Sequence, residues 1–230
     1  MKADIAERLA RLREDLEAEL RACGRAPGAV TIVGVTKKQP VEAMVAAVEA
    51  GLADLGENYV QEARAKFEVL DRLVARPPVA HFIGHVQTNK ANTIARVFDV
   101  VQSVDRVEAA RALGRAAENA GKRLRVLLQV NISPSERFGC PPDGAEALAE
   151  SIRSEPGLLL EGVMAIGPIG GPAPVPDALD EAFGLAAMTL GRVGGSTLSI
   201  GMSGDWREAV RAGSTMIRIG TALFGERRRD

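Results

Sequence analysis

The sequence predicts an α/β fold in the form of a single (β/α)8 TIM barrel with an additional N-terminal helix. Short apolar segments alternate eight times with segments of helical spacing, a pattern typical of a parallel sheet with crossover helices. The length of 230 residues suits eight such units in one domain over residues 1–230. A doubly wound open sheet is the alternative, but the turn after the first strand reads VTKKQP and lacks the GxGxxG pattern of that fold.

Each element is expected from its local pattern. The first is an amphipathic helix over residues 3–24, which covers either the barrel base or a second subunit and has an apolar stripe of Ile5, Leu9, Leu12, Leu16 and Leu20. Strands are expected at apolar runs bounded by turn residues: 30–35, 53–56, 79–83, 100–103, 124–131, 158–166, 197–200 and 215–219. Helices are expected between them at 41–50, 60–73, 91–97, 106–121, 143–154, 177–190 and 206–212, the fourth with Asp105 as its N-cap.

The charge and cysteine content argue against several classes of protein. Lys and Arg number 29 against 30 Asp and Glu, so we expect neither a nucleic acid nor a membrane as a partner. Cys23 and Cys140 lie far apart and only two histidines accompany them, so we expect no metal. The N-terminal segment lacks the apolar core of a signal peptide, and no apolar run is long enough to span a membrane. We therefore expect a cytoplasmic protein.

A lysine stands at the end of the first strand. If Val33, Val35 and Lys37 share one face of that strand, Lys37 continues an inward row while Thr36 and Lys38 turn away. The carboxyl ends of barrel strands form the active face. A desolvated lysine amine forms Schiff bases with carbonyl compounds. An exposed strand-end lysine is the simpler interpretation of this segment taken alone.

The loops after the seventh and eighth strands favour an anion. They read SIGMS over 199–203 and RIGTA over 218–222, and barrels tend to bind phosphate at these loops. Taken separately, Gly220 and Thr221 suit a plain turn, and Arg218 suits a salt bridge. Because strand one adjoins strand eight in a closed barrel, however, Lys37 and both loops face one pocket. A phosphorylated aldehyde fits that pocket, and pyridoxal 5'-phosphate (PLP) is the commonest.

Seven ordered stretches resemble the PLP homeostasis proteins, the small single-domain relatives of the barrel half of alanine racemase. They cover the whole chain and read VTKKQP, LGENYVQEA, HFIGHVQTNK, QVNIS, GVMAI, LSIGMSGD and AGSTMIRIGTALFG. The resemblance implies a fold-type III PLP barrel that holds the cofactor as a Schiff base on Lys37. It also implies a role in PLP homeostasis as a carrier or buffer of the cofactor, without robust turnover of its own.

The resemblance assigns cofactor-binding roles residue by residue. Lys37 matches the Schiff-base lysine, and no further catalytic residue is assigned. Arg218 matches the inward arginine near the cofactor, and Asn58 is expected near the ring. The phosphate contacts and their loop neighbour are Ser199, Met202, Gly220 and Thr221. The family often has a second lysine two positions after the first, where this chain has Gln39.

Other polar residues are candidates for chemistry. His81 is a candidate general base, although its place in a strand better fits a packed, hydrogen-bonded residue. Glu57 and Asp54 form a candidate carboxylate pair, although an acid at a helix start, favoured by the helix dipole, is the simpler interpretation of Glu57. Tyr59 is expected to form a pocket wall.

Three alternative functions are considered. One is a low-activity PLP-dependent racemase or lyase, with Lys37 as one base and Tyr59 or His81 as the other. The others are an aldolase whose Lys37 attacks a sugar phosphate, and a binding module for another phosphometabolite. The chain stops soon after strand eight, whereas related racemases take an acid or base from a following domain, so we expect cofactor exchange. PLP-dependent apoenzymes are the expected recipients, and we expect a monomer or a weak dimer.

Overall fold

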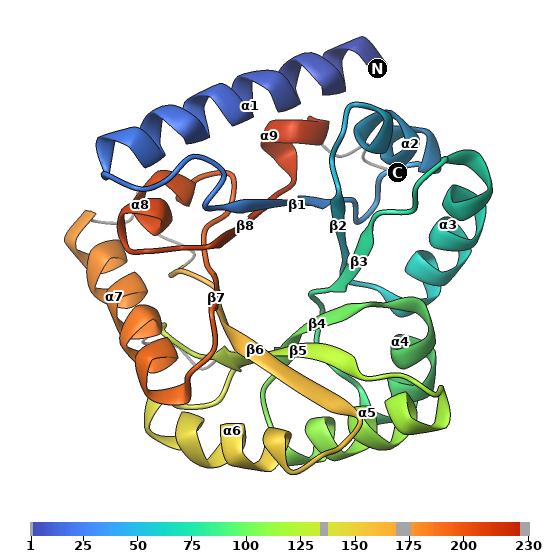
Figure 1. Ribbon diagram of the computed structural model, residues 1–230, viewed down its shortest axis with the longest axis vertical. Coiled ribbons are helices and arrows are strands. Elements are labelled where there is room, and N and C mark those ends of the chain that lie inside the picture. Colours follow the sequence, from blue (N-terminus) through green and yellow to red (C-terminus); the bar gives the residue numbers. More distant parts are fainter. Residues whose placement is uncertain (1, 134–137, 169–175, 226–230) are drawn as a thin grey trace.

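Eight parallel strands close into a barrel, in the order β1 to β8, and β1 pairs with both β2 and β8 (Figure 1). The structure is a computed structural model that describes residues 2–133, 138–168 and 176–225. The predicted barrel is confirmed. Its strands are β1 Thr31–Val35, β2 Asp54–Glu57, β3 Val79–Phe82, β4 Val100–Val104, β5 Leu124–Val130, β6 Leu158–Ala165, β7 Thr197–Ser199 and β8 Met216–Ile219.

Helices surround the barrel on the outside (Figure 1). Within the described ranges, the α-helices are α1 Lys2–Ala22, α2 Val41–Glu49, α3 Val60–Leu73, α4 Ala91–Val97, α5 Val107–Asn119, α6 Ala145–Arg153, α7 Pro176–Val193, α8 Trp206–Arg211 and α9 Thr221–Phe224. The sequence did not predict α9 or the short 3-10 helices η1 Thr88–Lys90 and η2 Pro142–Gly144. Each is a single turn, too short to show an apolar period.

The expected N-cap of α5 was wrong. Arg106 takes that position, in an extended conformation, and α5 begins at Val107. The Asp105 carboxylate is therefore one residue too early to cap the helix, and it accepts a hydrogen bond from Arg106 Nη1 at 2.7 Å.

Helix α1 packs on the side of its own barrel. All five residues of its predicted stripe are buried, and the helix contacts α2, α8 and α9 (Figure 1). The eighth βα unit ends in the four-residue α9, which is too short to cover the outside of β8 and β1. Helix α1 supplies that cover, so it lies on the side of the barrel and not at the expected barrel base. Its contact with a second subunit stays a prediction.

The core has two parts. Most buried apolar residues lie between the strands and the helices in one continuous cluster. Four others stand apart from that cluster, which agrees with a place inside the barrel: Val33, Val100, Leu127 and Met164. Several polar residues from the strands are buried as well, among them His81, Gln102, Ser199 and Arg218. This polar interior lies directly below the site described next.

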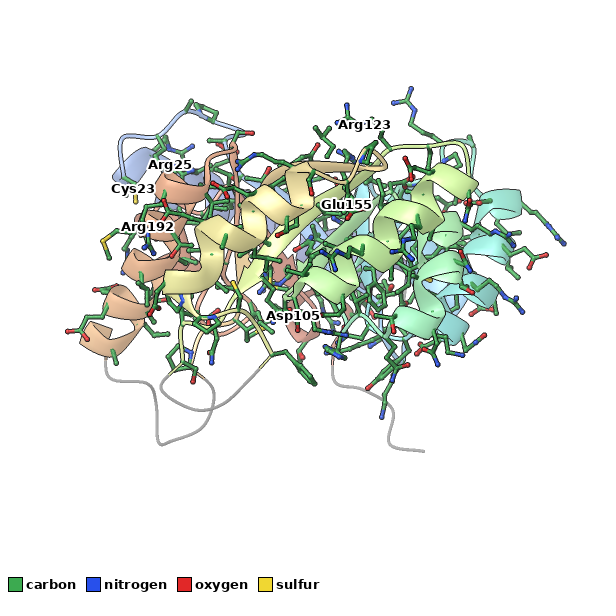
Figure 2. All side chains as sticks on the ribbon, turned by 90° about the horizontal axis from the view of Figure 1, so that it is seen from below. Cys23, Arg25, Asp105, Arg123, Glu155 and Arg192 are labelled. Atoms are coloured by element: carbon green, nitrogen blue, oxygen red, sulfur yellow. The ribbon has the colours of Figure 1, made fainter. Side chains whose placement is uncertain are left out.

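The carboxyl end of the strands can be identified from residues at the two ends of the barrel. Asp105 follows β4 and Arg123 precedes β5, and Figure 2 shows them at opposite ends of the molecule. The end marked by Asp105 is therefore the carboxyl end of the strands, where barrels place their ligands. Among the described residues, no helix is long and apolar enough to cross a membrane.

Candidate functional site

A cavity of about 250 Å³ opens at the carboxyl end of the strands. Six of the seven residues expected to bind a cofactor line it: Lys37, Asn58, Met202, Arg218, Gly220 and Thr221. A second cavity, of about 880 Å³, shares Asn58, Ile83 and Ile166 with the first. The closed barrel thus brings the strand-one lysine and both predicted anion loops to one place.

Lys37 reaches the cavity through the alternation of strand β1. Val35 and Lys37 both line the cavity, as the period-two pattern predicts. Thr36 turns the other way and is fully buried. Lys38 is exposed and has a φ of 58°, so the chain turns sharply after the lysine. Gln39 lines the cavity at the position where the family often has its second lysine.

The conformation of Lys38 leads to a prediction about stability. Replacing Lys38 with glycine is expected to raise the free energy of unfolding by about 1 kcal/mol, because an L-residue is strained at positive φ and glycine is not. The melting temperature should rise by about 2–4 °C, measured by calorimetry. Gln39→Gly is the control: Gln39 has no positive φ, so glycine there should lower stability. If Lys38→Gly is less stable than the parent, the claim that Lys38 is strained at its positive φ is contradicted.

Arg218 is buried below the two loops, with 4% of its surface exposed. Its Nη1 donates to the carbonyl oxygen and the Oγ of Ser199, both at 2.7 Å, and its Nη2 donates to the carbonyl of Ala165 at 2.8 Å. Burial lowers the pKa of Arg218 to about 10, and the charge of Asp205 opposes this shift. The guanidinium is therefore charged at neutral pH and held rigidly on the cavity wall.

Ser199 does not line the cavity, unlike the other residues expected to bind the cofactor. It is fully buried, donates its hydroxyl hydrogen to Gln102 Oε1 at 2.7 Å and accepts from Arg218. Because that hydrogen is already used, Ser199 supports Arg218 instead of facing a ligand. Ser203 and Gly204, later in the same loop, line the cavity in its place. Ser203 belongs to the predicted anion loop 199–203, whereas Gly204 was not predicted, because the period-two pattern stops where β7 ends, at Ser199.

The loop after β7 is held by one hydrogen bond within itself and by another from the segment after β8. The N–H of Met202 donates to Asp205 Oδ1 at 2.5 Å, and the N–H of Ala222 donates to Ser203 Oγ at 3.3 Å. Gly201 has a φ of 96°, and a Cβ there would lie 2.6 Å from the Cβ of Ala209, so this turn requires glycine.

A chain of hydrogen bonds crosses the barrel beneath Arg218. Asp54 Oδ1 lies 2.9 Å from His81 Nε2, and His81 Nδ1 lies 2.9 Å from Gln102 Nε2. Gln102 accepts from Ser199, which accepts from Arg218. Because the Gln102 amide nitrogen can only donate, His81 Nδ1 accepts, and His81 Nε2 carries the hydrogen given to Asp54. His81 is thus a hydrogen-bonded strand residue, as its position indicated.

The remaining candidates lie away from the cavity wall. The carboxylate of Asp54 contacts His81, so Asp54 and Glu57 form no pair. Glu57 is the last residue of β2 and is fully buried against Thr36 and Lys66, which overturns the interpretation of an acid at a helix start. Tyr59 is 53% exposed and is absent from the described lining of the 250 Å³ cavity. It lines a neighbouring cavity of about 320 Å³ that shares Asn58 with the first. Within the described ranges, no three His, Cys, Asp or Glu side chains are placed to hold a metal ion.

Comparisons with known proteins agree with the motifs. Residues 8–228 match the family described as alanine racemase, N-terminal domain. The pyridoxal phosphate homeostasis protein of Pseudomonas aeruginosa is 41% identical, over 97% of this chain and 96% of that protein. The protein of the same name from Escherichia coli K12 is 37% identical, over 97% of both.

A solved structure agrees as well. PipY of Synechococcus elongatus, determined with PLP bound, superposes with a TM-score of 0.83 and 32% identity, covering 96% of this chain and 100% of that chain. Sequence and structure therefore confirm the resemblance found in the seven motifs. The chain belongs to the alanine racemase N-terminal domain family and, within it, to the pyridoxal phosphate homeostasis proteins.

Proposed function

We propose that this chain binds PLP through a Schiff base to Lys37 and acts as a carrier or buffer of the cofactor. One observation carries the proposal: Lys37, the buried Arg218 and the loops after β7 and β8 surround one cavity. A ligand with an aldehyde, a ring nitrogen and a phosphate suits these three features together. The relatives' names and the PLP bound to PipY support this choice of ligand.

The residues around the cavity suit different parts of such a ligand. Ser203, Gly204, Gly220 and Thr221 offer hydroxyl and backbone N–H donors to a phosphate. Arg218 lies two residues before Gly220 on β8 and therefore deeper in the barrel, where it would face the ring of a bound PLP. A charged guanidinium only donates hydrogen bonds, so it favours an unprotonated ring nitrogen. When bound, PLP supplies an aldehyde carbon that exchanges imines between amines.

The cavity wall favours carriage over turnover. Of the described residues that line it, only Lys37 and Arg218 have ionisable side chains, and an arginine does not deprotonate. Racemisation needs an acid and a base on opposite faces of the α-carbon. The two partners considered for Lys37 are poorly placed, because Tyr59 is absent from the described lining and His81 is engaged by Asp54 and Gln102. The proposed recipients of the cofactor are PLP-dependent apoenzymes.

Transfer and turnover are measured on the same preparation. PLP-loaded protein is mixed with an aminotransferase stripped of its cofactor, and the recovery of aminotransferase activity is followed. We expect the aminotransferase to recover its activity during the incubation. In a parallel sample in D2O, NMR should show no exchange of the α-proton of amino acids. Exchange at the α-carbon of any amino acid would favour the racemase or lyase. If the protein does not bind PLP at all, the alternative of a binding module for another phosphometabolite would be favoured.

A further inference from the structure

Three charged side chains from β2 and α3 lie against the residues on both sides of Lys37. Lys66 and Glu62 contact the backbone of Thr36 and Lys38, and Glu57 accepts from the Thr36 hydroxyl. Glu57 ends β2, and Glu62 and Lys66 lie one helical turn apart on α3. None of the three is among the described residues that line the 250 Å³ cavity. Asn58, the neighbour of Glu57, does line the cavity. Residues 57–58 therefore direct the Asn58 side chain toward the cavity and the Glu57 carboxylate toward the turn after β1.

The residue before Lys37 is held at three of its polar groups. Lys66 Nζ donates to the carbonyl oxygen of Thr36 at 2.7 Å, and Thr36 Oγ1 donates to Glu57 Oε1 at 2.7 Å. The N–H of Thr36 donates to the carbonyl of Gly56 at 2.9 Å. Thr36 is fully buried, so water does not compete for these bonds and each one restrains the backbone strongly.

The residue after Lys37 is held in a strained conformation. Lys38 is the one non-glycine residue with positive φ in the described part of the chain. Its N–H donates to Glu62 Oε1 at 2.7 Å, and the same oxygen accepts from Lys66 Nζ at 2.9 Å. Backbone strain of this kind persists where the surroundings impose it, and it clusters at functional sites.

Lys66 joins the two sides of the turn. Its Nζ lies 2.6 Å from Glu57 Oε1, and the side chains of Lys66 and Glu57 are 9% and 0% exposed. Glu57 Oε2 has no hydrogen-bond partner among the described residues. Burial raises the pKa of Glu57 in spite of Lys66, which means that desolvation outweighs the pairing. Apolar side chains of the same shape often stabilise a fold as well as a buried ion pair does, so stability alone does not explain this cluster.

We propose that Lys66, with Glu57 and Glu62, acts as a positioning group that sets the Thr36–Lys38 turn and so aims the amine of Lys37 into the cavity. This inference rests on the proposed attachment of PLP to Lys37. It explains why the LGENYVQEARAK stretch combines one cavity residue with buried charges: the charges act on the lysine through its backbone.

Two variants test the inference. Lys66→Met keeps the length of the side chain and removes its charge and donors. The double variant Glu57→Leu/Lys66→Met also removes the carboxylate that would be left buried and unpaired, so it should fold even if the single variant does not. Lys122→Met is the matched control, since Lys122 Nζ also donates to a backbone carbonyl, that of Phe98, at 2.7 Å, and Lys122 does not line the cavity.

Two readouts are taken at a temperature where each variant is folded. One is the rate at which the visible band of the imine forms on mixing with PLP, together with its circular dichroism. The other is amide hydrogen exchange of residues 36–39 in protein without cofactor. In both Lys66 variants we expect imine formation to slow about tenfold or more, the dichroism of the band to weaken, and exchange of the turn to accelerate. The control should match the parent.

The outcomes separate the inference from the proposed function. Folded Lys66 variants that form the imine at the parental rate would overturn the positioning role, even if they melt at lower temperature. A double variant that recovers both stability and imine formation would also overturn it, because only the pairing of charges would then matter. If the parent protein forms no imine, the proposed function fails, and the exchange of residues 36–39 alone decides whether the cluster holds the turn.

Discussion

Replacing Lys37 with alanine is expected to abolish the visible absorption of the PLP-loaded protein. In the parent, we expect a band near ~420 nm that borohydride reduction converts into a stable covalent adduct, as for other lysine imines of this cofactor. Lys37 is the lysine whose side chain lines the 250 Å³ cavity in the described structure, so no other amine is placed to replace it there. Absorbance before and after reduction, with mass spectrometry of the labelled peptide, measures the effect.

Lys122→Met is the matched control for this experiment. Lys122 does not line the 250 Å³ cavity and donates to the carbonyl of Phe98, away from the lysine turn, so the band and the adduct should persist in that variant. An adduct that remains in Lys37→Ala and maps to another lysine would contradict the assignment. A bound cofactor without any band or adduct in the parent would show that PLP is held by its phosphate alone, and the carrier proposal would then lack its covalent step.

Replacing Arg218 with leucine is expected to have the second largest effect. The change leaves three acceptors without their donor, on Ser199 and Ala165, and removes the positive charge that acts on Asp205. We expect the free energy of unfolding to fall by about 3–5 kcal/mol, the range found when one partner of a buried charged group is removed. Urea unfolding measures this loss, and a PLP titration of the folded variant should show weaker binding.

The loss of stability in Arg218→Leu should be larger at high pH than at low pH. In the parent, burial raises the pKa of Asp205, and the charge of Arg218 opposes that shift. Without Arg218 the folded-state pKa of Asp205 rises further, which stabilises the protonated form in the fold relative to the charged form. The deficit of the variant should therefore be smaller at low pH, where Asp205 is protonated, and larger once pH exceeds that pKa. If the free energy of unfolding of Arg218→Leu falls short of the parent by the same amount below and above the pKa of Asp205, the coupling between Arg218 and Asp205 is contradicted.

Arg207→Leu is the control for the arginine experiment. Arg207 is on the surface, where it pairs with Asp15 at 3.1 Å and lies over the ring of Trp206. Exposed pairs contribute about 0–1 kcal/mol, so this variant should unfold close to the parent and bind PLP normally. A large loss for Arg207→Leu would mean that removal of any arginine from this part of the barrel destabilises the fold.

The sequence alone determined the features that depend on local repetition. Alternation of apolar and amphipathic segments predicted all eight strands and the seven helices between them, because the periods of 2.0 and 3.6 residues are local properties. The same period placed Lys37 on the inward row of β1. The stripe of α1 predicted its buried face, although not its partner. Closure of the barrel followed from the number of units and joined Lys37 to the loops after β7 and β8.

The tertiary structure decided which side chains meet across the barrel. Ser199 was expected to contact a phosphate, yet it donates to Gln102, a residue 97 positions away in the chain. Glu57 was expected to be an acid at a helix start, stabilised by the helix dipole. Instead, its carboxylate accepts a hydrogen bond from Lys66 next to the Thr36–Lys38 turn. The register and closure of eight strands set these contacts, and a local pattern reports the face of a residue but not its neighbour on another strand. Sequence therefore located the chemistry, and the packing of distant elements assigned each side chain its partner.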